Sequence, residues 1–593
     1  MNPHAAQHTD AFDAIADART IVEVVHAHAA QTPEQLALVF LGNGIDETAR
    51  WSCRDVAMNA ARVAVALQEA GAVGKRAVLL YEPGLEYVAA LLGALQAGMV
   101  AVPSFPPLGS RACERLAGIV VDADPDFVLS TSRLRQGEAD IRKRCARARF
   151  TWIATDMLPM PHEPPACEPV AADSLALLQY TSGSTGAPKG VMISHGNLVS
   201  NSRALLRTLA PASQRVGCSW LPPYHDMGLM GGILLPLVAG FPVLLFPAAH
   251  FVQSPVRWLR AIHRYGVTVT VAPNFALDLC TQGIADDDLA GIDLSSVTEL
   301  FCGAEPIRKN SVDHFAQRFR SHGFRSDAFL PCYGLAEATL FVTGKRRGSA
   351  PRHGAFDPLA LDLHRAVEVR EDEASARVLV SCGEAAVGHT VLVVDPDEHR
   401  PCAEGRVGEV WVAGPNVAHG YWQRAGETAA TFHATLADGS GPFMRTGDLG
   451  FLRGGELYIT GRIKDVIIIA GRNHYPQDIE LTAQDAHPDV RANGVAAFRI
   501  DAEHGEALVI VAEVRRRPRG RTVDVRAVRN AVINRTAAVH GVRPHAVHIG
   551  PVGTLPLTTS GKVRRRECRQ AFLSGSLPEL REAPHHEAHH ADA

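Results

Sequence analysis

Residues 180–190 read Tyr180-Thr181-Ser182-Gly183-Ser184-Thr185-Gly186-Ala187-Pro188-Lys189-Gly190, and this stretch decides the fold. A strand-like apolar run at residues 175–179 precedes it, and a second run at residues 191–193 follows it. Its glycines let the backbone turn sharply and bring N–H groups close to a polyanion. Its hydroxyls add hydrogen-bond donors, and Lys189 adds a point charge for phosphate. The stretch therefore predicts a phosphate-binding loop between two strands.

This loop differs from the Walker A loop of P-loop NTPases. Pro188 stands where that loop has a glycine before its lysine. The residues that follow, Val191-Met192-Ile193, read as a strand, whereas a Walker loop opens a helix. A surface turn rich in serine and glycine is the alternative for the stretch taken alone.

Strand-length apolar runs alternate with helical patterns along most of the chain before residue 460. Residues 77–81 read as a strand, residues 87–97 as a helix and residues 100–103 as a strand again. Further strands, of a more irregular β-rich subdomain, are expected at residues 391–394 and 408–412. The pattern predicts an α/β fold with layered sheets and helices.

Length and composition narrow the class of protein. A chain of 593 residues is too long for one hydrophobic core, so at least two domains are expected. With 46% apolar residues, 21% charged residues and a net charge of −4, it reads as a soluble globular protein that does not bind nucleic acid. None of the 11 cysteines forms a C-x-x-C pair, which argues against a zinc site or a disulfide framework. A reducing, cytoplasmic location is expected.

One uncharged stretch, residues 227–246, has the length of a membrane span. Several glycines and two prolines interrupt it, and no basic cluster follows it. We expect a buried helix, a turn at residues 239–242 and a buried strand at residues 243–246. The sequence therefore predicts no transmembrane segment, and residues 1–18 lack the apolar core of a signal peptide.

The C-terminal part of the chain has strand and helix patterns of its own. Residues 496–498, 507–514 and 545–549 read as strands, and residues 523–540 read as a helix. We expect the chain to comprise a flexible N-terminus (1–20), a large domain (21–463), a small, mobile α+β domain (464–573) and a disordered His-rich tail (574–593).

Five further motifs follow the phosphate loop. They are Cys302-Gly303-Ala304-Glu305-Pro306, Tyr333-Gly334-Leu335-Ala336-Glu337, Arg445-Thr446-Gly447-Asp448, Gly461-Arg462-Ile463-Lys464-Asp465 and Thr559-Ser560-Gly561-Lys562. In this order, and together with the loop, they resemble the motifs of the adenylate-forming superfamily. That superfamily includes acyl-CoA synthetases, firefly-type luciferases and the adenylation domains of peptide synthetases. The resemblance extends over residues 21–572, nearly the whole chain.

The resemblance implies ATP and Mg²⁺ as cofactors, bound where the two domains meet. The nucleotide-binding residues that it implies are Thr181, Ser182, Gly183, Ser184, Thr185, Gly186, Gly303, Ala304, Glu305, Tyr333, Gly334, Leu335, Ala336, Asp448 and Arg462. Glu337 would hold Mg²⁺, and Lys464 would be the hinge between the domains. Lys562 would be the catalytic lysine, with Lys189 and Glu337 also in the catalytic set.

These implied roles agree with the chemistry of the side chains. A carboxylate such as Glu337 suits a hard cation. Asp448 can accept hydrogen bonds from both ribose hydroxyls, and Lys562 can neutralise charge between a carboxylate and the α-phosphate. Taken singly, each residue also has a plain structural explanation: a surface ion pair, a turn aspartate or a solvated basic segment. The order of the motifs favours the functional interpretation.

Four other stretches indicate a branch of the superfamily. They are residues 102–107, residues 220–229 (Trp220-Leu221-Pro222-Pro223-Tyr224-His225-Asp226-Met227-Gly228-Leu229), residues 272–275 and residues 471–476. Together they resemble fatty acyl-AMP ligases, which pass the acyl group to the phosphopantetheine thiol of a carrier protein. The resemblance implies a fatty acid substrate and a separate acyl carrier protein as partner. Candidate residues for the acyl tail are His225, Met227, Met230, Gly231, Gly232, Asn274 and Phe275, although packing in the core explains them equally well.

A long connection at residues 343–380 resembles an insertion of fatty acyl-AMP ligases that packs against the large domain and restrains the small one. A mobile surface loop is the alternative. Arginines at residues 515–517, 519, 521 and 564–566 are candidates for docking an acidic carrier protein, with a solvated loop as the alternative. The sequence thus predicts activation of a medium- or long-chain fatty acid to acyl-AMP with release of pyrophosphate, then transfer to a carrier protein. A long-chain acyl-CoA synthetase and a non-catalytic acyl or nucleotide sensor are the alternatives.

Overall fold

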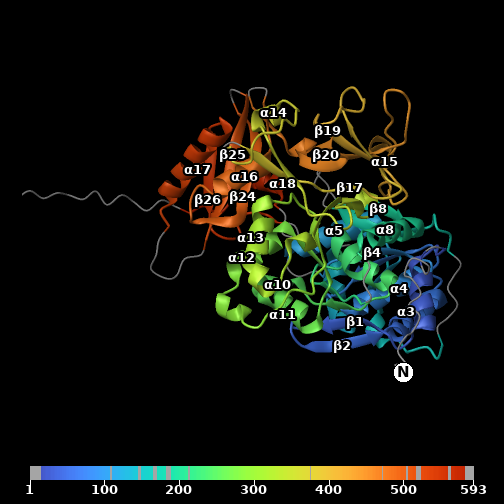
Figure 1. Cartoon of the computed structure of the whole chain (residues 1–593). Helices are drawn as coiled ribbons and strands as arrows, with labels where there is room; N and C mark the ends of the chain where they lie inside the picture. Colours follow the sequence, from blue (N-terminus) through green and yellow to red (C-terminus); the bar gives the residue numbers. More distant parts are fainter. Residues whose placement is uncertain are drawn as a thin grey trace, which may run out of the picture. The chain divides into compact units, whose positions relative to one another are not determined.

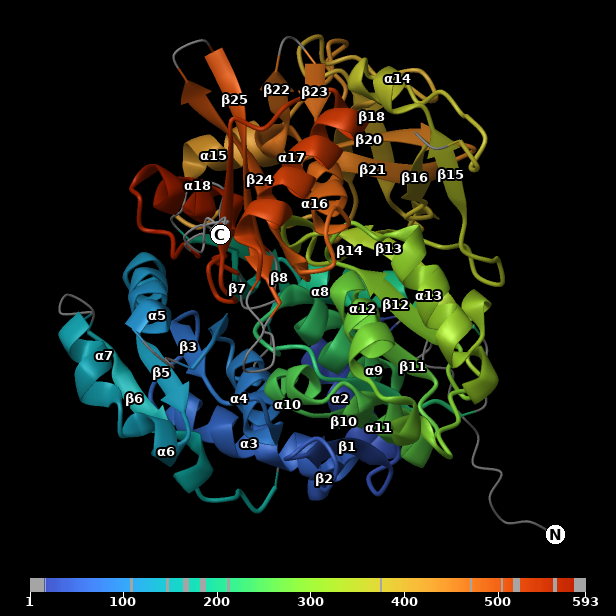
Figure 2. The same cartoon turned by 90° about the vertical axis from the view of Figure 1, so that its left-hand side faces the viewer.

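The computed structural model describes residues 15, 17–106, 110–144, 149–163, 170–181, 188–210, 214–373, 376–469, 472–502, 505–515, 523–557 and 563–580 (Figures 1 and 2). The chain divides into two compact units. Unit 1 comprises Met1–Gly354, Val378–Thr446 and Gly450–Ile459, and unit 2 comprises Ala355–Arg377, Gly447–Leu449 and Thr460–Ala593. The four-part division with its boundary at Lys464 stays a prediction.

Several predicted features lie outside the described residues. These are residues 1–14 and 16 of the N-terminus, the tip of the phosphate loop at residues 182–187, the arginines at residues 516–521, the lysine motif at residues 559–562, and the tail from residue 581 onward.

A six-stranded sheet of unit 1 carries the phosphate loop. Its order is β6 (Thr151–Ala154), β5 (Phe127–Ser130), β3 (Arg76–Leu80), β4 (Val100–Ser104), β7 (Leu175–Thr181) and β8 (Lys189–Ser194). Neighbouring strands run parallel except for β7 and β8, which form an antiparallel pair. Parallel neighbours need a crossover connection, and helix α4 (Leu85–Gln96) supplies it between β3 and β4. The strand–helix–strand succession predicted at residues 77–103 is confirmed, as are the strands on both sides of the loop.

A nine-stranded sheet forms the second layer of unit 1. Its order is β17 (Glu384–Ala385), β14 (Phe341–Gly344), β13 (Phe329–Gly334), β12 (Glu299–Gly303), β11 (Val269–Pro273), β9 (Gly217–Ser219), β10 (Val243–Leu245), β1 (Leu36–Leu41) and β2 (Glu47–Ser52). Helices α12 (Asn274–Gly283) and α13 (Lys309–Phe319) lie side by side over β11 and β12 (Figure 2). Two site motifs lie at the carboxyl ends of neighbouring strands, residues 302–306 at the end of β12 and residues 333–337 at the end of β13.

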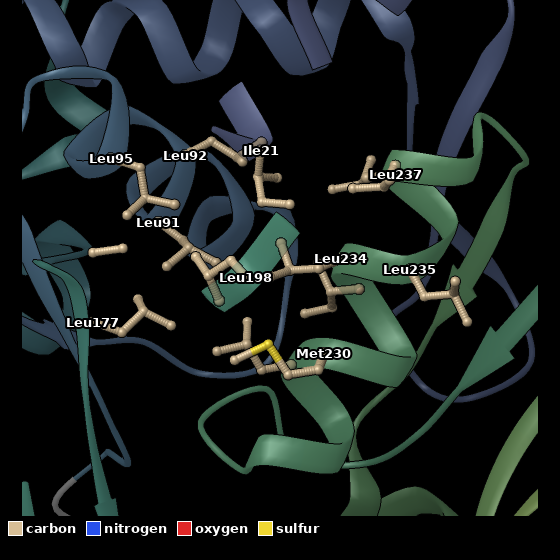
Figure 3. Packing of buried hydrophobic residues seen from close by; sticks show 14 of the residues in the cluster. Ile21, Leu91, Leu92, Leu95, Leu177, Leu198, Met230, Leu234, Leu235 and Leu237 are labelled. Carbon is tan, nitrogen blue, oxygen red and sulfur yellow. The ribbon is translucent and has the colours of Figure 1, made fainter. Parts of the chain in front are cut away.

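The core of unit 1 is built from buried helices. Leucines of α4 share one hydrophobic cluster with side chains of α2 (Ile21–Gln31), α8 (His195–Thr208), the π-helix η2 (Met227–Leu234) and α9 (Leu235–Ala239), part of which Figure 3 shows. Helix α4 is apolar around nearly its whole circumference, which suits a helix covered on all sides. It approaches α3 (Cys53–Glu69) closely at Gly93, where a Cβ would come within 2.6 Å of the Ala60 carbonyl oxygen.

The uncharged stretch at residues 227–246 folds as predicted, into helix, turn and strand. The π-helix η2 runs into α9, Gly240 ends α9 in the left-handed conformation (φ 69°), and β10 follows. Across the part of the chain that the structure describes, no helix combines the length and the apolar character needed to cross a membrane.

The remaining strands of unit 1 include the predicted β-rich subdomain. It is a four-stranded sheet of β18 (Thr390–Val394), β19 (Gly408–Ala413), β20 (Met444–Arg453) and β21 (Glu456–Arg462), in that order. Residues 447–449 of β20 and 460–462 of β21 are assigned to unit 2. The other principal helices of unit 1 are α5 (Ser110–Ala123), α7 (Glu138–Arg144), α10 (Ala248–Gln253), α11 (Val256–Tyr265) and α15 (Ala425–Phe432). The strands predicted at residues 391–394 and 408–412 are confirmed.

Unit 2 has a three-stranded sheet and a core of its own. The strands are β24 (Val490–Ala502), β25 (Gly505–Val514) and β26 (Ala546–Gly550), and the helices are α16 (Pro476–Gln484), α17 (Val525–His540) and α18 (Arg565–Leu573). A separate hairpin joins β22 (Ile467–Ile469) to β23 (Arg472–His474). The strands and the helix predicted for the C-terminal part are confirmed, and so is the α/β class of the chain.

The connection at residues 343–380 is structured over most of its length. It contains β15 (His353–Phe356), α14 (Pro358–Asp362) and β16 (Arg377–Val380). The sequence places this connection on the large domain, but residues 355–377 pack with unit 2. The Asn473 side-chain amide donates to the Asp362 carbonyl oxygen (3.1 Å), and Arg377 pairs with Asp478 (3.1 Å) and covers the Tyr475 ring. The physical reason for the difference is that Arg377 is nearly buried and finds its carboxylate partner on α16.

Candidate active site

The two ends of the phosphate loop are held by the β7–β8 pair. Thr181, the last residue of β7, pairs with Lys189, the first residue of β8. The Tyr180 hydroxyl donates to Asp122 Oδ2 on α5 (2.7 Å). Gly190 lets the Tyr180 ring lie over the strand, because a Cβ there would come within 3.0 Å of the ring. Thr181 and Lys189 therefore start and end the loop at fixed points of the sheet.

Lys189 is nearly buried, with 11% of its side chain exposed. Its ammonium forms an ion pair with Glu427 on α15 and lies 4.9 Å from the centroid of the Tyr421 ring. Tyr421 reaches this position because the chain around it runs antiparallel beside β8, with a bridge between Val191 and Tyr421. The hydrogen bond from Lys189 holds the pKa of Glu427 below its usual range, so this carboxylate is ionised at neutral pH.

Glu337 contacts the same tyrosine. The Tyr421 hydroxyl donates to Glu337 Oε1 (2.9 Å), and the Ala418 N–H donates to the Glu337 carbonyl oxygen (2.9 Å). Burial, together with the nearby Glu337 carboxylate, raises the pKa of Tyr421, which keeps its hydroxyl protonated as a donor. The structure therefore brings Lys189 and Glu337 together on either side of Tyr421.

The backbone around Glu337 is tightly constrained. Gly334 has no room for a side chain, since a Cβ there would lie 1.7 Å from the Leu340 carbonyl oxygen. The Leu335 N–H donates back to that same oxygen (2.9 Å), and Thr339 adopts a left-handed conformation (φ 62°). The Thr339 hydroxyl donates to the Asn416 carbonyl oxygen (2.7 Å), which satisfies it in the interior. Glu337 therefore sits in a short 3-10 turn that its neighbours fix on both sides.

Residues 303–305 comprise the last residue of β12 and the bend after it, beside the start of α12. Ala304 adopts φ 67°, and the Glu305 carboxylate accepts the Phe275 N–H (2.7 Å). Asn274 uses both ends of its amide, donating to the Ser311 hydroxyl (3.1 Å) and accepting from the Arg308 N–H (2.9 Å). The structure thus joins Glu305 to Asn274-Phe275, which the sequence assigned to different ligands. Because Asn274 is fully buried and its amide is engaged, it acts here as a structural residue.

The candidate residues for the acyl tail lie at the start of η2. His225 Nδ1 lies 3.1 Å from Asp226 Oδ1, and the same oxygen accepts the Met227 N–H (2.7 Å). Gly232 faces Ser219, and Met230 is 1% exposed within the hydrophobic core (Figure 3). These contacts describe helix capping and core packing. A role in binding an acyl chain stays a prediction.

Unit 2 carries the residues proposed for the ribose and the hinge. Asp448 is buried, with 4% of the residue exposed, and Arg462 Nε donates to its Oδ1 (2.8 Å). Lys464 lies in the 3-10 turn at Ile463–Asp465 that follows β21. Arg462 therefore orients the Asp448 carboxylate. The catalytic lysine predicted at position 562 lies outside the described residues.

One sequence-based assignment is wrong. Arg565 was a candidate for docking a carrier protein, but it lies at the start of α18 in a bidentate pair with Glu480 (2.6 and 2.7 Å). It also donates to Asp465 (3.1 Å), the residue after Lys464. Its side chain, paired with both carboxylates, is 23% exposed, so it is a structural anchor.

Four residues of this site carry no motif and were missed by sequence reasoning. They are Asp122, Tyr421, Arg424 and Glu427, which come from α5 and from the segment before and within α15. These residues contact the ends of the phosphate loop only because the chain folds back and brings this segment beside β8. No local sequence pattern could therefore have identified them.

A divalent cation fits the chemistry of Glu337. Among the described residues there is no group of three or more side chains arranged as metal ligands. Mg²⁺ is commonly held by one or two carboxylates together with substrate phosphates. A single, well-oriented carboxylate beside a phosphate loop agrees with such a shared site.

Comparison with known proteins shows which protein families the chain resembles. A family model of AMP-binding enzymes matches residues 25–422, and a model of the AMP domain of Disco-interacting protein 2-like proteins matches residues 464–582. The medium-chain-fatty-acid–[acyl-carrier-protein] ligase JamA of Moorena producens (strain JHB) is 40% identical over 569 residues, 94% of this chain and 96% of that protein.

A second relative and a solved structure have similar names and also match nearly the whole chain. The long-chain-fatty-acid–AMP ligase FadD23 of Mycobacterium tuberculosis is 36% identical, over 91% of this chain and 93% of that protein. The crystal structure of the fatty acyl-adenylate ligase from L. pneumophila, in complex with acyl adenylate and pyrophosphate, has a TM-score of 0.72 at 36% identity. It covers 95% of this chain and 98% of that one.

Proposed function

The chain belongs to the AMP-binding enzyme family, and we propose that it is a fatty acid–AMP ligase. It uses ATP to activate a medium- or long-chain fatty acid as acyl-AMP, releases pyrophosphate, and transfers the acyl group to an acyl carrier protein. The names of its relatives support both steps, since one is a fatty-acid–[acyl-carrier-protein] ligase and another a fatty-acid–AMP ligase. The observation that carries the proposal is the convergence of Lys189 and Glu337 on Tyr421, at the base of the phosphate loop.

The reaction joins two anions, so positive charge and orientation are what the protein must supply. A carboxylate oxygen of the fatty acid attacks the α-phosphorus, the bond from this phosphorus to the bridging oxygen breaks, and pyrophosphate leaves with its electron pair. The loop from Thr181 to Lys189 would donate backbone N–H groups and hydroxyls to the phosphates. Lys189 would add a charge at the end of that loop.

Mg²⁺ would supply additional positive charge on the phosphates when bound. Glu337 is the residue that we assign to it. The protonated Tyr421 hydroxyl donates to Glu337 Oε1, which restrains the carboxylate that would hold the cation. Since the Ala418 N–H also holds the Glu337 backbone, the carboxylate has little freedom to turn away.

Residues 303–305 and 333–336 would line the adenine. In unit 2, Asp448 would accept hydrogen bonds from the ribose hydroxyls while Arg462 holds its other side. Lys562 would stabilise the charge that develops between carboxylate and α-phosphate, where fixed positive charge has the largest effect. Lys464 would be the hinge on which the small domain turns between the two half-reactions.

The remaining assignments concern the acyl group and its acceptor. We assign the acyl tail to His225, Met227, Met230, Gly231, Gly232, Asn274 and Phe275. In this structure the amide of Asn274 is engaged and Met230 lies in the hydrophobic core, so the resemblance alone supports the inclusion of these two residues. We further propose that the enzyme works in the cytoplasm, since none of its cysteines is spaced as a C-x-x-C pair and reduced thiols are the norm there.

Product analysis tests the proposal. The full-length protein is incubated with ATP, Mg²⁺ and a panel of fatty acids, with no acceptor, with coenzyme A, or with a phosphopantetheinylated carrier protein. The proposal expects acyl-AMP without an acceptor, acyl-carrier protein with the carrier, and little acyl-CoA. Efficient acyl-CoA synthesis would instead identify an acyl-CoA synthetase, and no pyrophosphate with any acid would reject adenylation.

A further inference from the structure

The phosphate-loop lysine already has an anionic partner within the protein. Lys189 pairs with Glu427, which lies in the first turn of α15. Lys189 is 11% exposed, whereas 41% of the Glu427 side chain is exposed. An ammonium held between a carboxylate and the Tyr421 ring has only part of its donor capacity left for phosphate. What Glu427 does to Lys189 therefore bears directly on how phosphate binds.

Glu427 is fixed from its other side as well. Arg424 Nη1 lies 3.5 Å from Glu427 Oε1, and Arg424 Nη2 donates to Asp122 Oδ1 (2.9 Å). The second oxygen of Asp122 accepts the Tyr180 hydroxyl at the start of the loop. Arg424 also approaches the Pro188 carbonyl oxygen at the loop's end (3.4 Å). A continuous polar network thus runs from one end of the phosphate loop, through Glu427, to Lys189 at the other.

The contacts with Lys189 lower the pKa of Glu427, which keeps this carboxylate anionic at neutral pH. A polyphosphate that approaches Lys189 meets a fixed negative charge beside it. The phosphate must either share the ammonium with Glu427 or displace the carboxylate, and the carboxylate opposes it in both cases.

Building on the function proposed above, we propose that Glu427 is a counter-ion that competes with the phosphates of ATP and pyrophosphate for Lys189. The competition weakens the binding of ATP, and it weakens the binding of the departing pyrophosphate equally. An effect of this kind acts on ground state and transition state alike, so it changes KM and product inhibition without raising kcat. Glu427 is thus a positioning residue that sets nucleotide affinity and favours product release.

A different role for Glu427 predicts the opposite change in ATP affinity when the residue is replaced. If Glu427 served only to aim Lys189 at the phosphates, its loss would leave the lysine misplaced and weaken ATP binding. The competition model predicts tighter binding when the charge is removed. The direction of the change in affinity therefore separates the two.

The test compares the wild type with Glu427→Gln, which keeps the shape of the side chain and removes its charge. Calorimetric titration with Mg²⁺·ATP and with pyrophosphate gives dissociation constants without turnover. We expect both constants to fall by roughly threefold to tenfold, the size of one removed unit charge at a partly exposed site. KM for ATP should fall in parallel, with unchanged KM for the fatty acid and no rise in kcat.

Two further variants serve as controls. Glu427→Asp keeps the charge and should bind ATP much as the wild type does. Glu34→Gln removes the same charge from another surface ion pair, Glu34–Arg54 (2.6 Å), and should leave ATP binding unchanged. Should Glu427→Gln fail to fold, Glu427→Ala removes the charge too and is expected to tighten binding in the same direction.

Unchanged or weaker binding of ATP by a folded, neutral variant would overturn the proposal. So would an equal effect of Glu427→Gln in a Lys189→Met background, since the competition needs the lysine and the double variant should show a smaller gain. These outcomes are separate from those of the proposed function. A wild type that binds ATP but releases no pyrophosphate with any fatty acid would refute the ligase, while the titration would still decide the role of Glu427.

Discussion

Replacing Arg565 by methionine should destabilise unit 2 severely, although the residue looks like part of a basic surface segment in the sequence. In the structure Arg565 makes two hydrogen bonds to Glu480 (2.6 and 2.7 Å) and one to Asp465 (3.1 Å). Methionine preserves the aliphatic stem but leaves two carboxylates facing each other. Removing one partner of a buried ion pair costs roughly 3–5 kcal/mol.

The lower end of that range applies here. Glu480 keeps the Ala497 N–H as a donor (3.0 Å), and a third of the Asp465 side chain is open to water. We therefore expect a loss of about 3 kcal/mol in the free energy of opening unit 2. Since 1.4 kcal/mol corresponds to a factor of ten, amide protection in α16 and β24 should fall roughly 100-fold.

Hydrogen–deuterium exchange followed by mass spectrometry measures this protection in the intact chain. Arg566→Met, which changes the exposed neighbour, is the matched control and should alter protection little. In the double variant Arg565→Met/Glu480→Gln the orphaned charge is gone, so much of the protection should return. If Arg565→Met changes protection no more than the control does, the ion pair contributes nothing and our reasoning about unit 2 is wrong.

Three other perturbations test separate parts of the structure. Burial raises the pKa of Asp362 to about 7, above an unfolded value near 3.9, so its folded state loses stability as pH rises from about 4 to 7. Asp362→Asn should therefore stabilise unit 2 at pH 8 and not at pH 4, as denaturant unfolding at the two pH values will show. An equal effect at both pH values would contradict the shift. Glu337→Gln should reduce turnover by about 10²-fold or more and weaken the dependence of turnover on Mg²⁺, with an unchanged KM for the fatty acid. Unchanged Mg²⁺ dependence would make Glu337 a purely structural residue. Lys562→Ala should lower acyl-AMP formation by roughly 10²- to 10³-fold with an unchanged melting temperature, and near-normal adenylation would exclude its catalytic role.

The sequence predicted the parts of the site that depend on local patterns. Apolar runs before and after the loop predicted β7 and β8, and these strands place Thr181 and Lys189 opposite each other. The motif at residues 333–337 was identified as part of the site by its resemblance to the superfamily, and the Gly334 backbone shows why only glycine fits there. Local patterns suffice in these cases because the geometry is set by neighbouring residues in the chain.

Contacts between distant segments could not be predicted in this way. Tyr421 links Lys189 to Glu337 only because the segment around residue 420 returns beside β8. For the same reason Arg565 looked like a surface arginine, since its partner Glu480 is 85 residues away. Met230 shows that the sequence also cannot separate a core residue from a ligand-binding residue. An apolar residue next to a motif has no pattern that separates a ligand wall from the core, and the structure places it in the core.

Labelled oxygen tests the central claim most directly, because it follows the bond that the enzyme makes. A fatty acid carrying ¹⁸O in both carboxyl positions is incubated with ATP, Mg²⁺, the full-length protein and a phosphopantetheinylated carrier protein, and the released nucleotide is analysed by mass spectrometry. Attack of the carboxylate on the α-phosphorus transfers one labelled oxygen to AMP when the thiol takes the acyl group. Our account predicts AMP with one ¹⁸O and unlabelled pyrophosphate. Unlabelled AMP, or ADP together with labelled inorganic phosphate, would contradict it.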